Sequence, residues 1–344
     1  MRPIEPGELG ILKLVFGRED DGGFGVKHML PIPLRPADGE PDDLFRLGDE
    51  MLLAQPAYLS TILTTLRQSI VPIVAMVSGE STMRCLGTGF FVSATGLLVT
   101  AAHVITDPIE RDYGGVRADD HGWSCAELGL GVMMNVGPHA WRFRTIEWAQ
   151  FLSDPSERPL PVRGHDLRLL SDTAICQVQR SPGEIFQPLT IIQPWLLGTG
   201  LAMGKSAAAI GFGTMQNTTL ELRHPDQVLG DFNFDLYVST GTILEHLPDN
   251  SINRQALTPG PVFRASLKLP GGMSGSPIFD DEGIYVHGVA SSGLEGADGL
   301  ADHGIGSMLA ASLHVPINRL EERTLLELLK SGHLGMPKLN LPDG

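Results

Sequence analysis

The chain has 344 residues, of which 42% are hydrophobic and 19% charged, a composition typical of a globular protein rather than a disordered one. Its 25 basic and 40 acidic side chains give a formal net charge of -15, which argues against a nucleic-acid partner. The 41 glycines and 25 prolines favour many short strands joined by turns, so the expected class is all-β.

The opening residues, MRPIEPGELGILKLVFG, lack the basic stretch and apolar run of a signal peptide. No window is long and apolar enough for a membrane span, so we expect a cytoplasmic protein without a membrane partner. The three cysteines, Cys85, Cys125 and Cys176, lack the spacing of a disulfide framework or a zinc site. We therefore expect neither a metal nor another cofactor.

Residues 1–68 are predicted to form an N-terminal extension. A proline-rich acidic stretch within it, LPIPLRPADGEPDD, indicates a loop. Pro56 then precedes an apolar stripe with the i, i+3, i+4, i+7 spacing of an amphipathic helix, formed by Leu59, Ile62, Leu63 and Leu66. We expect this helix to pack on the main body of the protein.

Residues 69–180 are predicted to hold a first set of strands. The run GTGFFVS, a turn at 94–96 and the run LLVT together indicate a strand, a turn and a strand. The same type of pattern continues through WRFRTIEW and DTAICQV. In the last run Ala174, Cys176 and Val178 alternate like the buried face of a strand.

A proline-containing connector, SPGEIFQPLTIIQP, leads to a second set of strands predicted within residues 181–315. This set includes the runs AAAIGFG, NFDLYVSTGTIL, FRASLKL, PIFD and IYVHGVASS. Residues 316–344 are predicted to form a C-terminal helix and tail. Pro316 opens the run INRLEERTLLELLK, in which one helical face is apolar and consists of Ile317, Leu320, Leu325, Leu328 and Leu329.

The loop GGMSGSPIF at 271–279 places one hydroxyl, that of Ser274, in a backbone that neither a helix nor a buried strand would favour. A serine becomes a nucleophile when a positioned base takes its proton and a third group orients that base. His103 follows the predicted strand LLVT, and Asp172 begins the strand DTAICQV, where its carboxylate is expected to be partly buried. Asp166 is the alternative to Asp172.

Attack on a carbonyl group creates an oxyanion, which backbone N–H groups can stabilise when no side chain obstructs them. The amides of Gly272 and Ser274 are the candidate donors. A plain glycine-rich turn would also explain the small residues around Ser274. It would not explain why a suitably placed histidine and aspartate occur earlier in the chain.

Spacing excludes two other motifs. MGKS at 203–206 would need a glycine at position 199 to complete a phosphate-binding loop, but Thr199 stands there. A hydrolase elbow of the form G-x-S-x-G would need a glycine at position 276 and then a helix. Ser276 is instead followed by Pro277 and a strand-like run.

TAAH at 100–103, D-x-A at 172–174 and GMSGSP at 272–277 resemble, in this order, the three motifs of the trypsin-like (chymotrypsin-fold) serine peptidases. The resemblance covers roughly residues 69–331. It implies two six-stranded antiparallel β-barrels packed face to face, with an active site between them. The first barrel would carry the histidine and the aspartate, and the second would carry the serine.

The same resemblance implies that His103 is the general base, Asp172 its orienting partner and Ser274 the nucleophile, with the amides of Gly272 and Ser274 as the oxyanion hole. It also implies that the backbone of 291–293 (Ser291, Ser292 and Gly293) pairs with an extended substrate.

The primary specificity pocket remains open at this point. By resemblance its walls include residues 268–273, 291–293 and part of 302–308. Lys268 would favour an acidic substrate side chain if it points into the pocket, whereas Asp298 or Asp302 at its base would favour a basic one.

Secreted members of this family are activated when a new amino terminus pairs with an aspartate just before the nucleophile. Met273 occupies that position, so the chain resembles the intracellular or bacterial branch instead. The expected function is a serine endopeptidase that cleaves protein or peptide substrates through an acyl-enzyme. Two alternatives stay open: a catalytically silent scaffold that binds protein partners, and a peptidase that is inactive until a regulatory protein docks.

Overall fold

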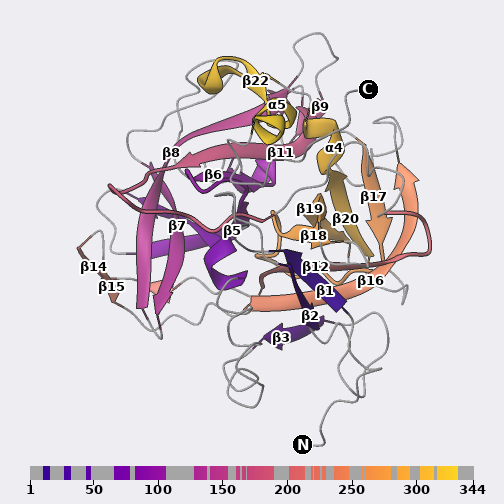
Figure 1. Ribbon diagram of the computed structural model, residues 1–344, viewed down its shortest axis with the longest axis horizontal. Helices are drawn as coiled ribbons and strands as arrows, with labels where there is room; N and C mark the ends of the chain where they lie inside the picture. Colours follow the sequence, from indigo (N-terminus) through magenta and orange to yellow (C-terminus); the bar gives the residue numbers. More distant parts are fainter. Residues whose placement is uncertain are drawn as a thin grey trace, which may run out of the picture.

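The computed structural model describes residues 66–105, 128–189, 201–247, 258–294 and 303–331, with short gaps, and three strands of the N-terminal extension. Those three strands are β1 (Ile11–Val15), β2 (Lys27–Pro31) and β3 (Leu44–Leu47). Most of the described elements are strands, which confirms the all-β class. Figure 1 shows them gathered into two bodies, the first in purple and magenta and the second in orange.

The first body is a closed antiparallel barrel with the strand order β5-β4-β7-β8-β11-β6, closed by pairing of β6 with β5. Its six strands are β4 (Ile70–Val77), β5 (Thr82–Phe91), β6 (Leu97–Thr100), β7 (Leu128–Gly137), β8 (Ala140–Ser153) and β11 (Leu169–Val178). The short strand β13 (Thr218–Thr219) extends this sheet beside β5, and a hairpin of β9 (Leu160–Val162) and β10 (His165–Leu167) precedes β11.

The second body is also a closed antiparallel barrel, with the order β12-β18-β19-β20-β17-β16 and closure between β16 and β12. Its six strands are β12 (Ser206–Phe212), β16 (Leu236–Leu247), β17 (Val262–Ala265), β18 (Pro277–Phe279), β19 (Val286–Leu294) and β20 (His303–Met308). Strand β3 adds to β16, so the N-terminal extension contributes a seventh strand to this sheet. A separate hairpin joins β14 (Glu221–His224) and β15 (Gln227–Leu229).

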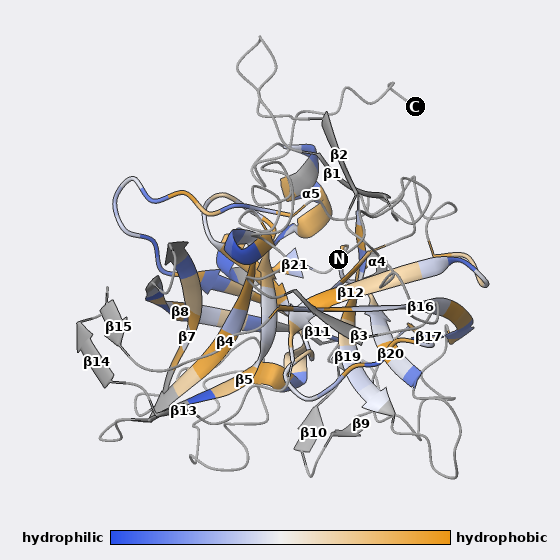
Figure 2. Ribbon diagram, turned by 90° about the horizontal axis from the view of Figure 1, so that it is seen from below, coloured by the Kyte–Doolittle hydropathy of each residue, from blue (hydrophilic) through white to orange (hydrophobic). Residues whose placement is uncertain are grey.

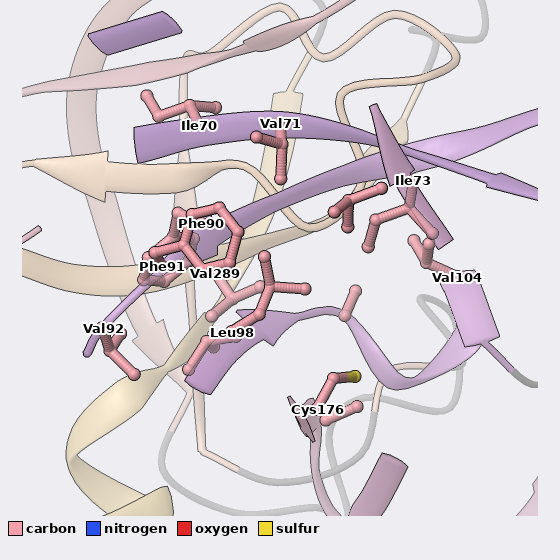
Figure 3. Close-up of a cluster of buried hydrophobic side chains, with 14 of the residues drawn as sticks. Ile70, Val71, Ile73, Phe90, Phe91, Val92, Leu98, Val104, Cys176 and Val289 are labelled. Carbon is pink, nitrogen blue, oxygen red and sulfur yellow. The ribbon is translucent and has the colours of Figure 1, made fainter. Parts of the chain in front are cut away.

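Two six-stranded barrels were the expected fold, and the pairings confirm it. One hydrophobic cluster joins them, since buried residues of β12 and β19 belong to the same cluster as those of β4, β5, β6 and β11. Figure 3 shows this packing, with Val289 of the second barrel beside Phe90, Phe91 and Leu98 of the first. Figure 2 shows apolar residues along strands such as β4, β5 and β12. The barrels therefore meet over a continuous apolar core.

Two of the three cysteines belong to the described residues. Cys176 is fully buried in the shared core, and Cys85 is partly buried beside it. Both are free thiols, and burial raises the pKa of Cys85 to about 12, so this thiol stays protonated at neutral pH. Cys125 lies outside the described residues.

The C-terminal helix exists, but it is shorter than predicted. The chain after Pro316 forms β21 (Pro316–Ile317), a 3₁₀ turn (Asn318–Leu320) and β22 (Arg323–Thr324) before the helix α5 (Leu325–Lys330) begins. Glu321 and Glu322 both have φ of 58°, a left-handed backbone that interrupts a helix. Thr324 and Glu327 then form a capping box, in which each side chain accepts the backbone N–H of the other, at 3.1 and 2.8 Å.

Most of the helix predicted after Pro56 lies outside the described residues. The part that is described, 66–69, is helical, and its Leu66 is fully buried in the shared core. Another short helix, α4 (Leu309–Ser312), follows β20. Across the described ranges, no helix combines the length and the apolar character needed to cross a membrane.

Candidate active site

His103 lies on a single helical turn, residues 102–105, that begins just after β6. Ala101 and Ala102 are fully buried and anchor this turn, while the imidazole keeps 21% of its surface exposed. Because the antiparallel register pairs Thr100 with Ala174, the chain beyond β6 runs past Asp172 of β11. Strand pairing therefore brings together two residues that are far apart in the sequence.

Asp172 binds His103 with both carboxylate oxygens. The Nδ1 atom of the imidazole lies 2.7 Å from Oδ2, and the backbone N–H of His103 donates to Oδ1 at 3.0 Å. The carboxylate is almost completely buried, with 3% of the residue exposed. A carboxylate at Nδ1 keeps the proton on that nitrogen, so Nε2 is left as the proton acceptor.

The pKa of Asp172 lies below its ordinary value. Burial by itself raises this pKa, but the charge of the neighbouring His103 and the hydrogen bonds from His103 and Ser291 lower it further than burial raises it. The group is therefore an anion at neutral pH, and it stabilises an imidazolium that forms beside it.

Ser291 links Asp172 to Ser274. Its hydroxyl donates a short hydrogen bond to Oδ2 of Asp172 and lies 3.2 Å from the hydroxyl of Thr258, while its carbonyl accepts the Ser274 hydroxyl at 3.1 Å. A register shift between Ala290 and Ser292 leaves Ser291 out of the β19–β20 pairing, and such bulges re-aim a side chain. The sequence predicted only a backbone role for Ser291, because nothing in SSG distinguishes its hydroxyl from that of Ser292.

The structure thus brings His103, Asp172 and Ser274 close to Ser291, but hydrogen bonds do not connect the three in a single chain from Ser274 to His103 to Asp172. Within the described part of the chain, no hydrogen bond joins Ser274 to His103, since the serine hydroxyl is directed to the Ser291 carbonyl. Catalytic hydrogen bonds are often formed only when substrate is bound, so this arrangement is compatible with a resting site. A general-base role for His103 would require the Ser274 side chain to turn toward Nε2.

The loop that carries Ser274 has the shape that the glycines predicted. Gly272 and Gly275 have φ of 97° and 88°, a region that favours glycine. A Cβ at Gly275 would lie 2.0 Å from the carbonyl oxygen of Thr88, so no side chain fits there. Of the backbone and side-chain oxygens in the described residues, none accepts the N–H of Gly272 or of Ser274. Both candidate oxyanion donors are therefore available to a ligand.

The remaining predicted site residues are only partly within the described residues. Lys268 is partly buried and its backbone N–H donates to the Ser239 hydroxyl at 2.8 Å. The hydroxyl of Ser292 is buried without a partner within the described ranges, and Gly293 is exposed. Asp298 and Asp302 lie outside the described residues, as does the side chain of Asp166, whose backbone belongs to the separate hairpin strand β10.

The described residues contain no group of three His, Cys, Asp or Glu side chains that could hold a metal ion. The chemistry that this site can perform with its own groups is proton transfer by an oriented imidazole to and from a hydroxyl, next to a pair of free backbone amides.

Comparisons with known proteins identify one matching family. Residues 87–286, more than half of the chain, match the family described as the trypsin-like peptidase domain. No curated protein gives a significant sequence match.

Three similar solved structures are Deg5, the inactive form of the Rv3671c protease, and neuropsin, a serine protease expressed in the limbic system of mouse brain. Deg5 is 15% identical with a TM-score of 0.42, and 74% of this chain and 91% of that chain are covered. The Rv3671c protease is 18% identical with a TM-score of 0.38, covering 74% and 90%. Neuropsin is 13% identical with a TM-score of 0.43, covering 72% and 92%.

Proposed function

The chain belongs to the trypsin-like peptidase family, and from that premise we propose that it is a serine endopeptidase acting on protein substrates. One observation carries the proposal: both oxygens of the buried Asp172 carboxylate hold His103, and the nucleophile candidate Ser274 lies one hydrogen bond away from the same network. A buried anion fixed on an imidazole in this way is the arrangement that a general base needs.

The reaction runs in two halves. The Nε2 atom of His103 takes the proton of the Ser274 hydroxyl while Oγ attacks the carbonyl carbon of the substrate, and the amides of Gly272 and Ser274 bind the oxyanion. The imidazolium then gives its proton to the leaving amine, and an acyl-enzyme remains on Ser274. Water, deprotonated by the same imidazole, hydrolyses the ester and restores the hydroxyl.

Substrate binding provides a reason for Ser274 to turn. The carbonyl of Ser291, which accepts the serine hydroxyl in the free protein, is also one of the backbone groups expected to pair with an extended substrate. A substrate N–H that occupies this carbonyl displaces the serine hydroxyl, which then finds Nε2 of His103 as its next acceptor. When substrate binds, the Ser274 hydroxyl therefore exchanges its hydrogen bond to the Ser291 carbonyl for one to Nε2 of His103.

A fluorophosphonate probe tests the proposed function, because it reacts only with an activated serine. We expect stoichiometric labelling of the folded wild type on a peptide that contains Ser274, and no labelling of the Ser274→Ala variant, measured by mass spectrometry after digestion. Wild-type protein that is folded but unlabelled would favour the non-catalytic scaffold over the enzyme.

We propose that Leu269, rather than the neighbouring Lys268, determines primary specificity. Gly293 of β19 and Gly304 of β20 are paired opposite each other, two residues beyond Ser291 along β19. A Cβ at Gly293 would lie 2.5 Å from the carbonyl oxygen of Leu269, and one at Gly304 would lie 2.7 Å from its Cδ1. The Leu269 side chain thus lies beside Gly304 and its backbone carbonyl beside Gly293, and from this we infer a narrow pocket that takes a small apolar substrate side chain.

Cleavage of a peptide library should therefore favour alanine or valine before the cleaved bond by at least about 10-fold over arginine, aspartate or phenylalanine. Pocket size discriminates against the larger side chains by roughly that factor, and burial of an unpaired charge disfavours aspartate and arginine. Leu269→Ala should shift the preference toward leucine and phenylalanine, whereas Lys268→Ala should leave the profile as it is. A wild-type preference for acidic residues that disappears in Lys268→Ala would show that Lys268 determines specificity instead.

A further inference from the structure

We propose that Thr88 is a positioning residue for the oxyanion-binding loop, which it holds from the opposite barrel with its side-chain hydroxyl. Thr88 lies on β5 of the first barrel, whereas the loop with Gly272 and Ser274 belongs to the second. The inference rests on the proposed function, because an oxyanion loop has a role only in an enzyme. It concerns a residue that touches neither the substrate nor the reacting atoms.

All four polar functions of Thr88 are used. Its N–H donates to the carbonyl of Ser274 at 2.8 Å, and its carbonyl accepts the hydroxyl of Thr100 at 2.7 Å. Its own hydroxyl donates to the carbonyl of Gly272 at 2.9 Å and accepts the N–H of Phe212 at 2.9 Å. Because the N–H of Phe212 can only donate, the Thr88 hydroxyl accepts that bond, and its own proton points to the carbonyl of Gly272.

These bonds fix the peptide groups on both sides of an oxyanion donor. The carbonyl of Gly272 belongs to the peptide group between residues 272 and 273, and the carbonyl of Ser274 to the one between 274 and 275. The N–H of Ser274 lies on the peptide group between these two. Holding both neighbours fixes the two Cα atoms between which the middle peptide group lies, and the carbonyl of that group, on Met273, accepts the N–H of Ser276 at 3.0 Å. The Thr88 hydroxyl thereby helps to set the position of an amide that it does not touch.

The surroundings of Thr88 are closely packed. Thr88 is fully buried, and two glycines near it let backbone meet backbone while a third lets the backbone meet the Ser276 side chain. A Cβ at Gly87 would lie 2.8 Å from the Ser274 carbonyl oxygen, one at Gly275 2.0 Å from the Thr88 carbonyl oxygen, and one at Gly211 1.7 Å from the Ser276 hydroxyl. Loss of the hydroxyl would therefore leave the Gly272 carbonyl without its partner, and its peptide group would be held only through the Met273 N–H, which donates to the carbonyl of Pro270 at 3.1 Å.

The test compares Thr88→Val, which keeps the shape and removes the hydroxyl, with Thr88→Ser, which keeps the hydroxyl. Ser93→Ala is the matched control for stability, because Ser93 is also fully buried and its hydroxyl also accepts a backbone N–H, that of Leu97 at 2.9 Å, while its hydrogen bonds within the described residues involve 95–97 and not the loop. If Thr88→Val does not fold, Thr88→Ala takes its place. Unfolding temperatures are measured for every variant.

We expect Thr88→Val to lower kcat by about 10- to 100-fold with KM within about 3-fold, somewhat less than the 10²- to 10³-fold cost of deleting an oxyanion donor. Thr88→Ser should recover kcat to within about 3-fold of the wild type. A peptidyl boronate, which forms a tetrahedral adduct with the serine, should bind Thr88→Val more weakly by the same factor, while a product peptide binds unchanged.

The possible failures can be told apart. Equal kcat in Thr88→Val, Thr88→Ser and Ser93→Ala, in an active wild type, would overturn the role of Thr88 and leave the proposed function intact. A loss confined to KM, or a loss of kcat that Ser93→Ala shares, would make Thr88 merely structural. A wild type that neither cleaves peptides nor reacts with a fluorophosphonate would overturn the proposed function and this inference with it.

Discussion

Replacement of Ser274 by alanine is expected to lower kcat by about 10⁶-fold, because it removes the atom that forms the acyl-enzyme. The oxyanion donors and the substrate-binding strand remain, so KM should change little and a residual acceleration of about 10³- to 10⁴-fold over the uncatalysed reaction should persist. Steady-state hydrolysis of a peptide selected from the library measures both quantities, provided that the variant is expressed in a host without other serine peptidases of this type.

Ser276→Ala is the matched control for this experiment, since Ser276 lies two residues further along the same loop. Its hydroxyl is fully buried and has no hydrogen-bond partner within the described residues, while its backbone groups bind Met273 and Ala290. Alanine keeps those backbone bonds, and kcat should stay close to that of the wild type. If Ser274→Ala kept more than about 1% of kcat while Ser276→Ala lost it, the nucleophile would have to be reassigned.

The sequence was sufficient for the parts of the fold that local pattern determines. Alternation in DTAICQV predicted the strand that carries Asp172, and the strand, turn and strand over GTGFFVS and LLVT occur as β5, a turn with Gly96 at φ of 99°, and β6. The closure of each barrel was implied only by the family resemblance. Pairings such as that of β12 with β16 join residues that are distant in the chain, and a strand's own residues do not specify its partner.

The C-terminal segment shows why periodicity alone misplaced a helix boundary. The apolar residues from Ile317 to Leu329 fit one helical face, yet two consecutive left-handed glutamates divide the segment. The signal that marks the actual start was present as Thr324 and Glu327, whose T-x-x-E spacing is that of a capping box. A capping signal inside an apolar stripe should therefore have outweighed the stripe.

The residues that support the site were harder to find than those that were assigned catalytic roles. His103 and Ser274 lie in short runs with a recognisable chemistry, whereas Thr88 and Ser291 act through partners 184 and 119 residues away, on Gly272 and Asp172. Buried polar groups need partners, but the sequence does not say which ones the fold will supply. The local signal for Thr88 was a polar residue between two glycines in GTGFFVS, a run whose other strand residues are mainly apolar.

Replacement of Asp172 by asparagine is expected to lower kcat by about 10⁴-fold near neutral pH with little change in KM. The asparagine amide keeps the shape of the carboxylate, but it can present an N–H to Nδ1 of His103. The ring proton then moves to Nε2, which can no longer accept the proton of Ser274, and the imidazolium loses the anion that stabilises it. Kinetics of the acylation step, followed by single-turnover release of the first product, measure this loss directly.

The same variant should change the pH dependence of stability. Because the pKa of Asp172 in the folded protein lies below its ordinary value of 3.8, its carboxylate contributes stability that is fully present above about pH 4 and is lost as the pH falls through the lower folded value. Wild type and Asp172→Asn should therefore differ most in unfolding free energy near neutral pH, and the difference should shrink in acid. Urea denaturation at a series of pH values measures it.

Asp166→Asn separates the two candidate carboxylates. Asp166 belongs to the hairpin strand β10, while both oxygens of Asp172 bind His103, so Asp166→Asn should keep kcat close to that of the wild type. If it were Asp166→Asn that lost kcat by orders of magnitude and Asp172→Asn that lost little, then the buried pair of His103 and Asp172 would not be the proton-transfer unit. The mechanism would then have to be rebuilt around a different orientation of the imidazole, because no other group described here holds Nδ1.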